Sequence, residues 1–480
     1  VKGADKTLNL KVVGGCIRLQ GTSSLAYPIK NYRVYFRSAN DSKVFGQVYV
    51  GVDDLGNNGT LIDNPKPVWS FKNANTLGKL PAPVNVWCLK ADFAESSSSH
   101  NTGMARMTND TLVLTNNPTP VQKYVASDYA YDVRTTVDGE PCFLFFRNTI
   151  NDKPQFLGKY NMNNDKSTEE VFGFKGVKGY HDATWVQTKF AGVNPTECWE
   201  FLNNDFAMGK YLDDDFDTRD TLGKPEWAKV FEARFPDVQA DYDTGVLGKP
   251  LLLSNWVTWV KSTSTNTAKF KAELKNYADV AHLCKYFVFT QLMGAVDQMV
   301  KNAMLAFWYS PDADKMLAYY IFYDNDTILG VRNDGRLKYD WDLSRQTLDT
   351  ELTTSAGSNI YAYMGHDSVL WNNLETQFKD EIRDAYKSIR SYLTNDKLFN
   401  YFNKDQSEKF AERIYNLDAQ HKYIEPKTLG IDVVSNGNLV NNKYSYLESM
   451  QGSRTSHRKW WLENRLDLFD ARYGTGEYTL

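Results

Sequence analysis

The pattern of apolar positions is strongest in the stretch that starts at His282. Apolar residues recur every three or four positions from Leu283 through Phe287 and beyond, and few polar residues interrupt them. This spacing predicts a helix that is buried on most of its sides. A turn at 310–316 and an aromatic run at 317–323 follow, so we expect a buried helix that leads into a buried strand.

Polar side chains interrupt this apolar stretch at two places. Asp297 and Asn302 lie within the predicted helix, five positions apart, and Asp324 and Asp326 lie at the end of the strand. Buried acids and amides are costly unless they are paired, hydrogen-bonded or bound to a metal. One interpretation is a polar network that closes a loop. The other is that Asp297, Asn302 and Asp324 converge on a site for a cation or a phosphate.

The spacing of these residues has a parallel in phosphotransferases. A kinase catalytic loop places an Asp five positions before an Asn, and a later strand supplies a second Asp that binds metal. Asp297 and Asn302 match the first spacing, and Asp324 or Asp326 matches the later acid. Because D-x-x-x-x-N is frequent by chance, the hypothesis depends mainly on the acid-rich strand end.

The rest of the chain places strands before helices. Alternating apolar and polar positions predict strands at 7–20, 32–37, 84–90, 141–148 and 155–162. Short strands and loops are expected at 166–260, and long loops at 41–85 and 424–444. Helical spacing predicts helices at 372–394, with Asn395 as its stop, and at 405–418 and 455–473. This order is typical of the α+β class.

No linker separates the chain into independent halves, so we predict one intertwined unit in three parts. A strand-rich N-terminal lobe occupies 1–162, an insertion and connecting region 163–275, and a helix-rich C-terminal lobe 276–480.

Composition and charge exclude several functional classes. With 480 residues, 42% hydrophobic and 14% aromatic, the chain has ample material for a core. A net charge of −4 gives no electrostatic case for binding nucleic acid, and no apolar run is long enough to span a membrane. The five cysteines form no C-x-x-C pair, so we expect reduced thiols rather than disulfides or a zinc site.

Several segments resemble the CotH family of spore-coat atypical kinases. IRLQGTSSLAYPIKNYRVYF is similar to the opening motif of that family, and WCLKADFAESSSSHNTGMARM to its next motif, in which Asp92 precedes Asn101. VDQMVKNAMLAFW and YYIFYDNDTILG are similar to the two segments of the family's active site. The resemblance implies an atypical protein-kinase-like fold with loop insertions.

The resemblance also implies roles for single residues. Lys30 would contact nucleotide phosphates, Asp297 would be the catalytic base or substrate-positioning acid, and Asn302 and Asp324 would bind magnesium, with Asp326 as a further ligand. ATP and magnesium are the implied cofactors. The chain departs from ordinary kinases, since it has no H-R-D, no D-F-G and no glycine-rich loop.

Other interpretations stay open at some of these residues. Lys30 fits a phosphate contact or a plain salt bridge equally well. For Asp92 and Asn101, a helix cap and hydrogen bonds that hold loops together (loop ties) are favoured over a role in the site. Without metal, Asp324 and Asp326 would repel each other. We expect Lys30, or an arginine such as Arg18 or Arg33, to neutralise one of them.

A second resemblance covers nearly the whole chain. The segments HDSVLWNNL at 366–374 and MQGSRTSHRKWW at 450–461 are similar to CotH-like proteins of tailed bacteriophages. It implies a structural protein of the phage tail or neck appendage, assembled in the bacterial cytoplasm, which needs no cofactor for that role. The resemblance implies other tail or portal-vertex proteins as partners, and a homo-oligomer in a ring or appendage. In this interpretation kinase activity is lost or dispensable; the alternative is an active kinase that phosphorylates Ser or Thr of a protein.

Two charged segments complete the candidates. Arg454, His457 and Arg458 flank two tryptophans in one predicted helix, which fits either an interface or amphipathic packing with a solvated basic edge. The acidic run at 213–217 lacks EF-hand spacing, so a solvated loop is favoured over a calcium site.

Overall fold

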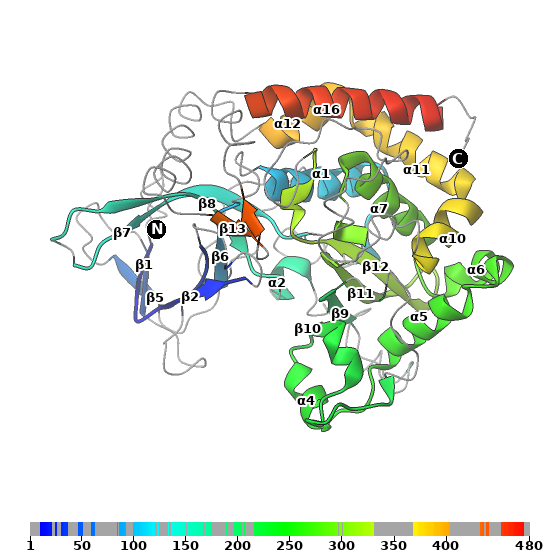
Figure 1. Ribbon diagram of the computed structural model, residues 1–480, viewed down its shortest axis with the longest axis horizontal. Coiled ribbons are helices and arrows are strands. Elements are labelled where there is room, and N and C mark those ends of the chain that lie inside the picture. Colours follow the sequence, from blue (N-terminus) through cyan, green and yellow to red (C-terminus); the bar gives the residue numbers. More distant parts are fainter. Residues whose placement is uncertain are drawn as a thin grey trace.

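Two larger β-sheets and a layer of helices form the part of the protein that the computed structural model describes (Figure 1). The described residues, apart from isolated positions, are 10–21, 30–36, 47–50, 59–62, 86–92, 99–120, 136–149, 151–166, 169–173, 196–203, 216–295, 297–299, 301–330, 368–403, 433–435, 438–440 and 453–474. Strand-rich sheets come first and most helices later, so the mixed α+β class predicted from the sequence is confirmed.

The first sheet has five antiparallel strands in the order β2-β3-β6-β8-β7. These are β2 (Cys16–Gln20), β3 (Asn31–Tyr35), β6 (Val86–Lys90), β8 (Gln155–Asn164) and β7 (Gly139–Phe146). The single strand expected at 7–20 is two strands, because Gly14 adopts a left-handed φ of 81° and turns the chain. A separate sheet contains β1 (Leu10–Val13), β4 (Gln47–Val50) and β5 (Thr60–Ile62).

Alternation along its strands gives the five-stranded sheet two different faces. Trp87, Leu89 and Met162 lie on one face, in an apolar cluster shared with the second large sheet. Lys90 and its cross-strand partner Asn161 lie on the other. This polar face matters because Lys90, at the end of β6, reaches the candidate site.

The second sheet is antiparallel in the order β10-β9-β11-β12. Its strands are β10 (Phe231–Phe235), β9 (Thr196–Phe201), β11 (Ala303–Ser310) and β12 (Lys315–Phe322). β11 is buried on both faces, since Leu305 belongs to the apolar cluster of the helices and Trp308 to that of the first sheet. β9 and β10 come from the predicted connecting region and β11 and β12 from the predicted C-terminal lobe.

The helix predicted to contain Asp297 and Asn302 is shorter than expected, and that prediction is wrong. α7 (Val280–Met293) begins after Asp279, whose side chain caps it, and ends at Gly294 with φ 62°. A left-handed glycine is a common helix terminator. The apolar run after Asn302 pairs with β9 and β12 as strand β11, so tertiary pairing decides its conformation.

The other helices lie mainly in the second half of the chain. They are α1 (His100–Leu114), α2 (Glu169–Phe172), α4 (Gln239–Thr244), α5 (Leu251–Ser262), α6 (Thr267–Glu273), α10 (Val369–Gln377), α11 (Lys379–Tyr392), α12 (Asn395–Asn403) and α16 (Ser453–Phe469), which a π-helical turn, η11 (Asp470–Gly474), extends. None of the described helices is long and apolar enough to span a lipid bilayer.

Comparison with the predicted helices gives mixed results. The helix at 455–473 is confirmed, whereas the one at 372–394 is broken at Phe378 into α10 and α11. Asn395 begins α12 instead of ending a helix. Helices α4 and α5 occupy part of the region at 166–260 where strands and loops were expected. The helix predicted at 405–418 lies outside the described residues. The strands β13 (Val433–Ser435) and β14 (Asn438–Val440) pair within the predicted loop at 424–444.

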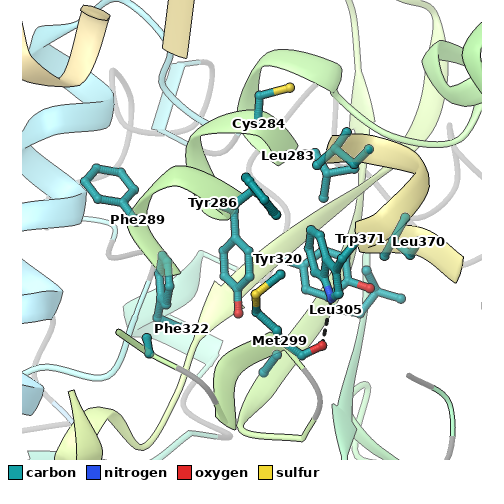
Figure 2. Close-up of a cluster of buried hydrophobic side chains, with 14 of the residues drawn as sticks. Leu283, Cys284, Tyr286, Phe289, Met299, Leu305, Tyr320, Phe322, Leu370 and Trp371 are labelled. Atoms are coloured by element: carbon teal, nitrogen blue, oxygen red, sulfur yellow. Dashed lines mark hydrogen bonds between the residues drawn. The ribbon is translucent and has the colours of Figure 1, made fainter. Parts of the chain in front are cut away.

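Aromatic side chains form the centre of the larger core cluster (Figure 2). The ring of Tyr320 on β12 lies 5.2 Å from that of Tyr286 on α7 and 5.0 Å from that of Trp371 on α10. All three side chains are almost completely buried. This cluster joins the second sheet to α7 and α10, so it supports the segment between α7 and β11. None of the five cysteines, which all lie in the described part of the chain, forms a disulfide bond, as the sequence predicts.

Candidate functional site

The Asp297 turn is held in place by the aromatic core. Asp297 begins a short 3-10 turn, η7 (Asp297–Met299), and is buried. The Tyr286 hydroxyl donates to the carbonyl of Gln298 at 2.7 Å. The Trp371 indole donates to the carbonyl of Met299 at 2.7 Å, as the dashed line in Figure 2 shows. Buried hydrogen bonds to the backbone fix the path of this turn, so the position of Asp297 depends on the core.

Asp297 and Asn302 contact each other, as their spacing predicts. The Asn302 amide donates to Oδ2 of Asp297 at 3.3 Å, and the backbone N–H of Asn302 donates to the Asp297 carbonyl at 3.1 Å. Lys301 Nζ lies 3.9 Å from the same Oδ2. The turn therefore closes on itself and presents a carboxylate and an amide side by side.

The end of β12 lies directly beside this turn. Gln298 donates its side-chain amide to the carbonyls of Tyr323 and Asp324, at 3.1 and 2.8 Å. Asp324 has a left-handed φ of 54° and precedes a second 3-10 turn, η8 (Asn325–Thr327). A non-glycine residue in this conformation is uncommon and points to a local constraint. Gln298 thus brings together the two segments that supply Asp297 and Asp324.

The start of α1 holds the η8 turn from the other side. The backbone N–H of Asn325 donates to Oδ1 of Asn101 at 2.6 Å, and the Asn101 amide donates to Asp92 Oδ1 at 3.4 Å. Asn161 on β8 donates to Asp92 Oδ2 at 2.5 Å. Asp92 and Asn101 therefore serve as loop ties, as predicted, although the helix cap position belongs to Ser99.

The basic residue beside Asp324 is Lys90, which the sequence analysis missed. Its Nζ lies 3.5 Å from Asp324 Oδ1 and 5.9 Å from the centre of the Tyr323 ring. Burial is the largest single effect on Lys90 and disfavours its charged ammonium. The surrounding groups, of which Asp324 contributes most, together outweigh burial and raise the pKa of Lys90 well above its usual value. Its place at a strand end, two positions before Asp92, was the available signal.

Asp326 lies in a strongly acidic environment. Burial is the main cause that raises the pKa of its carboxyl well above the usual value, and the neighbouring carboxylates of Asp324 and Asp92 raise it further. Lys90 acts in the opposite direction. Lys90 therefore relieves part of the predicted repulsion between Asp324 and Asp326, and the raised pKa favours the protonated form of Asp326.

The cations expected for that task are found in other contacts. Lys30 Nζ donates to the Leu25 carbonyl at 2.7 Å, Arg33 forms an ion pair with Asp165 at 2.7 Å, and the Arg18 guanidinium lies 4.4 Å from the centre of the Tyr35 ring. The residue after Lys30, Asn31, accepts a hydrogen bond from the backbone of Ala91 at 2.7 Å. Lys30 thus lies close in sequence to a residue that contacts the Lys90 strand end.

The donor atoms of the site fit a hard divalent cation. Among the described residues, no group of three His, Cys, Asp or Glu side chains is arranged as a metal site. Magnesium, however, commonly binds one or two carboxylates and takes its other ligands from water and substrate phosphates. Asn302, Asp324 and Asp326 supply oxygens of this kind, and the buried side-chain oxygens of Asn325 and Thr327 have no hydrogen-bond partner. These residues fit magnesium held jointly with a phosphate.

The two remaining candidates are resolved in part. Arg458 and Trp461 on α16 are buried, which favours packing, whereas Trp460 is 36% exposed; the side chains of Arg454 and His457 lie outside the described residues. In the acidic run, Asp217 forms an ion pair with Lys249 at 2.9 Å, as a solvated loop would.

Comparison with known proteins supports the kinase-like interpretation. Residues 237–449 match the family described as CotH kinase protein. The matched range contains Asp297, Asn302, Asp324 and Asp326, whereas Lys90 precedes it. A search of curated proteins found no match. Residues 237–449, less than half of the chain, are therefore similar to a CotH kinase family domain, for which a kinase-like fold is expected.

Proposed function

We propose that this protein transfers the γ-phosphate of ATP to a serine or threonine hydroxyl of a protein substrate. One observation carries the proposal: the Gln298 side chain donates to the Asp324 carbonyl and so joins the Asp297 turn to the end of β12. Lys90 lies beside the Asp324 carboxylate. The site thus combines a candidate base, carboxylates and a cation. These are the groups that phosphoryl transfer requires, because its catalysis consists mainly of positioning and charge stabilisation.

Asp297 is the proposed base. The acceptor hydroxyl oxygen forms a bond to the γ-phosphorus while the bond from that phosphorus to the β,γ-bridging oxygen breaks, and ADP leaves with the electron pair. Asp297 takes the hydroxyl proton. The hydrogen bond from Asn302 and the ion pair with Lys301 orient its carboxylate for this role.

The other residues of the site bind phosphates and metal. Asn302, Asp324 and Asp326 would hold magnesium, which when bound supplies positive charge to the phosphate oxygens. Lys90 lies beside Asp324 and is the proposed cation for the phosphates; the resemblance of the opening motif adds Lys30. A bound cation would also favour the ionised form of Asp326.

Incubation of the purified protein with labelled ATP, magnesium or manganese, and a Ser/Thr-rich protein acceptor tests this proposal. Asp324→Asn should reduce the transferred label by at least about 100-fold. Asp314→Asn is a matched control, because Asp314 also has a left-handed φ, of 52°, but lies at the opposite end of β12. Absence of label with the unchanged protein, or equal label in Asp324→Asn, would refute the proposal.

A place in a bacteriophage particle is a second candidate role and stays a prediction from the resemblance. The β7–β8 hairpin extends away from the helices (Figure 1), and the side chains of Phe143, Phe145 and Phe146 on it are 45–57% exposed. Exposed aromatic residues are frequent at interfaces, so assembly into a tail or neck appendage, as a homo-oligomer or with other tail proteins, would use such an arm. Mass spectrometry of purified particles tests it, and absence of the chain from virions would count against it.

A further inference from the structure

We infer that α16 positions the candidate site through two buried arginines, Arg458 and Arg465. This inference rests on the proposed function and extends it to a helix that lies after the matched range of 237–449. The two arginines are seven positions apart, so they lie on the same face of the helix. Both are almost fully buried, at 3% and 1% exposure.

Arg458 acts on the start of α1. Its Nη1 donates to the hydroxyl of Ser99 at 2.6 Å. Ser99 occupies the N-cap position of α1, but its side chain makes no capping hydrogen bond to the helix. Its hydroxyl accepts from Arg458 instead. The next two residues hold the η8 turn, because His100 Nδ1 lies 3.2 Å from the Asp326 carbonyl and Asn101 accepts from the backbone of Asn325.

Arg465 acts on the end of α7. Its Nε donates to the carbonyl of Gln291 at 3.0 Å, and its guanidinium lies 4.6 Å from the centre of the Phe469 ring. The same carbonyl accepts from the N–H of Gly294 at 3.3 Å, at the C-terminus of α7. A cation at a helix C-terminus interacts favourably with the carbonyls of the last turn and with the helix dipole. Gln291 lies six positions before Asp297, so this contact fixes the helix end from which the Asp297 turn departs.

The two arginines therefore hold different halves of the site. Arg458 supports the segment with Asp324 and Asp326 through α1, and Arg465 supports the Asp297 turn through α7. α16 packs against α12 and against α7 (Figure 1). A helix that only packed against the core would not need a guanidinium at each of these two points.

The test compares Arg458→Lys with Arg465→Lys, each of which keeps the charge but loses the planar set of donors. Arg458→Lys should raise the magnesium concentration needed for half-maximal transfer by roughly ten-fold, as outer ligand supports commonly do. Arg465→Lys should lower kcat by a similar factor while the KM for ATP stays unchanged. Lys459→Ala is the control, because Lys459 lies on the exposed face of the same helix.

Hydrogen exchange measured on the same variants separates this inference from the proposed function. Arg458→Lys should speed amide exchange at 324–327 and Arg465→Lys at 294–299, each more than in the other segment. If the protein shows no phosphate transfer but exchange changes in this pattern, positioning stands and the proposed function fails. Unchanged exchange in both variants, or a uniform increase in both segments, would overturn the inference.

Discussion

The two walls of the candidate site differ in how they are encoded. The acid wall consists of Asp297, Asn302, Asp324 and Asp326, and all four lie within one short part of the matched range 237–449. The opposite wall consists of Lys90, Asp92 and Asn101, which precede that range. Lys90 and Asp324 are 234 positions apart in sequence, yet 3.5 Å separates their charged atoms.

This difference shows which part of the site can be recognised locally. Hydrogen bonds between near neighbours build much of the acid wall, as with Asp297 and Asn302. The opposite wall depends on the pairing of β6 with β8, which places Lys90 opposite Asn161, and on the packing of α1 against η8. A family comparison that covers only the acid wall therefore includes the proposed metal ligands but not Lys90, whose charge lies beside Asp324.

The strongest test of this comparison removes the charge of the opposite wall. Lys90→Met should lower kcat/KM for ATP by roughly 100-fold, because a lysine that neutralises phosphates in a partly buried site is hard to replace. It should also destabilise the metal-free protein, since Asp324 loses the ion pair with Lys90 and Asp326 loses the positive charge that acts on it. Enzyme assays and thermal unfolding with and without magnesium measure both effects.

Lys166→Met is the control for that variant. Lys166 lies 4.6 Å from the centre of the same Tyr323 ring, but its ammonium pairs with Glu200 at 2.6 Å. Glu200 would keep Arg234 as a partner. If Lys90→Met and Lys166→Met lose activity equally, the charge of Lys90 has no specific role in catalysis, and the distinction between the two walls of the site is wrong.

A smaller effect is expected when the tie between the two walls is removed. Asn101→Ala leaves the Asn325 N–H without its acceptor and Asp92 with one donor fewer, which should cost about 1–3 kcal/mol of unfolding free energy and reduce activity several-fold. Asn109→Ala removes another buried amide from α1, one that accepts from Gln122 at 2.7 Å. It should cost similar stability in urea unfolding without reducing activity; a parallel loss of activity would make Asn101 a purely structural residue.

The sequence predicted the polar residues of the acid wall better than the elements that carry them. The spacing of Asp297 and Asn302 correctly indicated that they meet, but the helix expected around them ends at Gly294. Periodicity cannot distinguish a buried helix from a buried strand in a short apolar run. β11 is such a run, and its pairing on both sides settles its conformation.

The opposite wall was recognised only in part, for a related reason. Asp92 and Asn101 were correctly expected to be loop ties, whereas Lys90 was counted only as the last residue of a strand. Its role depends on a contact with Asp324 that no local pattern encodes. The cations expected to neutralise Asp324 or Asp326 were predicted from their place in the opening motif. Arg33, for example, forms its ion pair with Asp165.

The smallest predicted effect concerns Asp326, whose raised pKa results first from burial and then from Asp324. As pH rises above the usual carboxyl range, the unfolded chain ionises at this position before the folded protein does, so folding stability falls until the folded pKa is passed. Asp326→Asn mimics the protonated form. In EDTA, it should therefore raise the melting temperature near pH 8 and have little effect near pH 4.

Asp314→Asn should show the opposite trend. Hydrogen bonds from Lys189 and then Tyr309 lower the pKa of Asp314, so its contribution to stability is present above the usual carboxyl pKa and is lost as pH falls. Replacing it should lower the melting temperature at neutral pH and have less effect in acid.

Added magnesium should reverse the sign of the Asp326→Asn effect near pH 8, because the cation favours the ionised carboxylate, and should leave the effect of Asp314→Asn unchanged. If the melting temperatures of the two variants depend on pH in the same way, burial and the neighbouring carboxylates do not raise the pKa of Asp326.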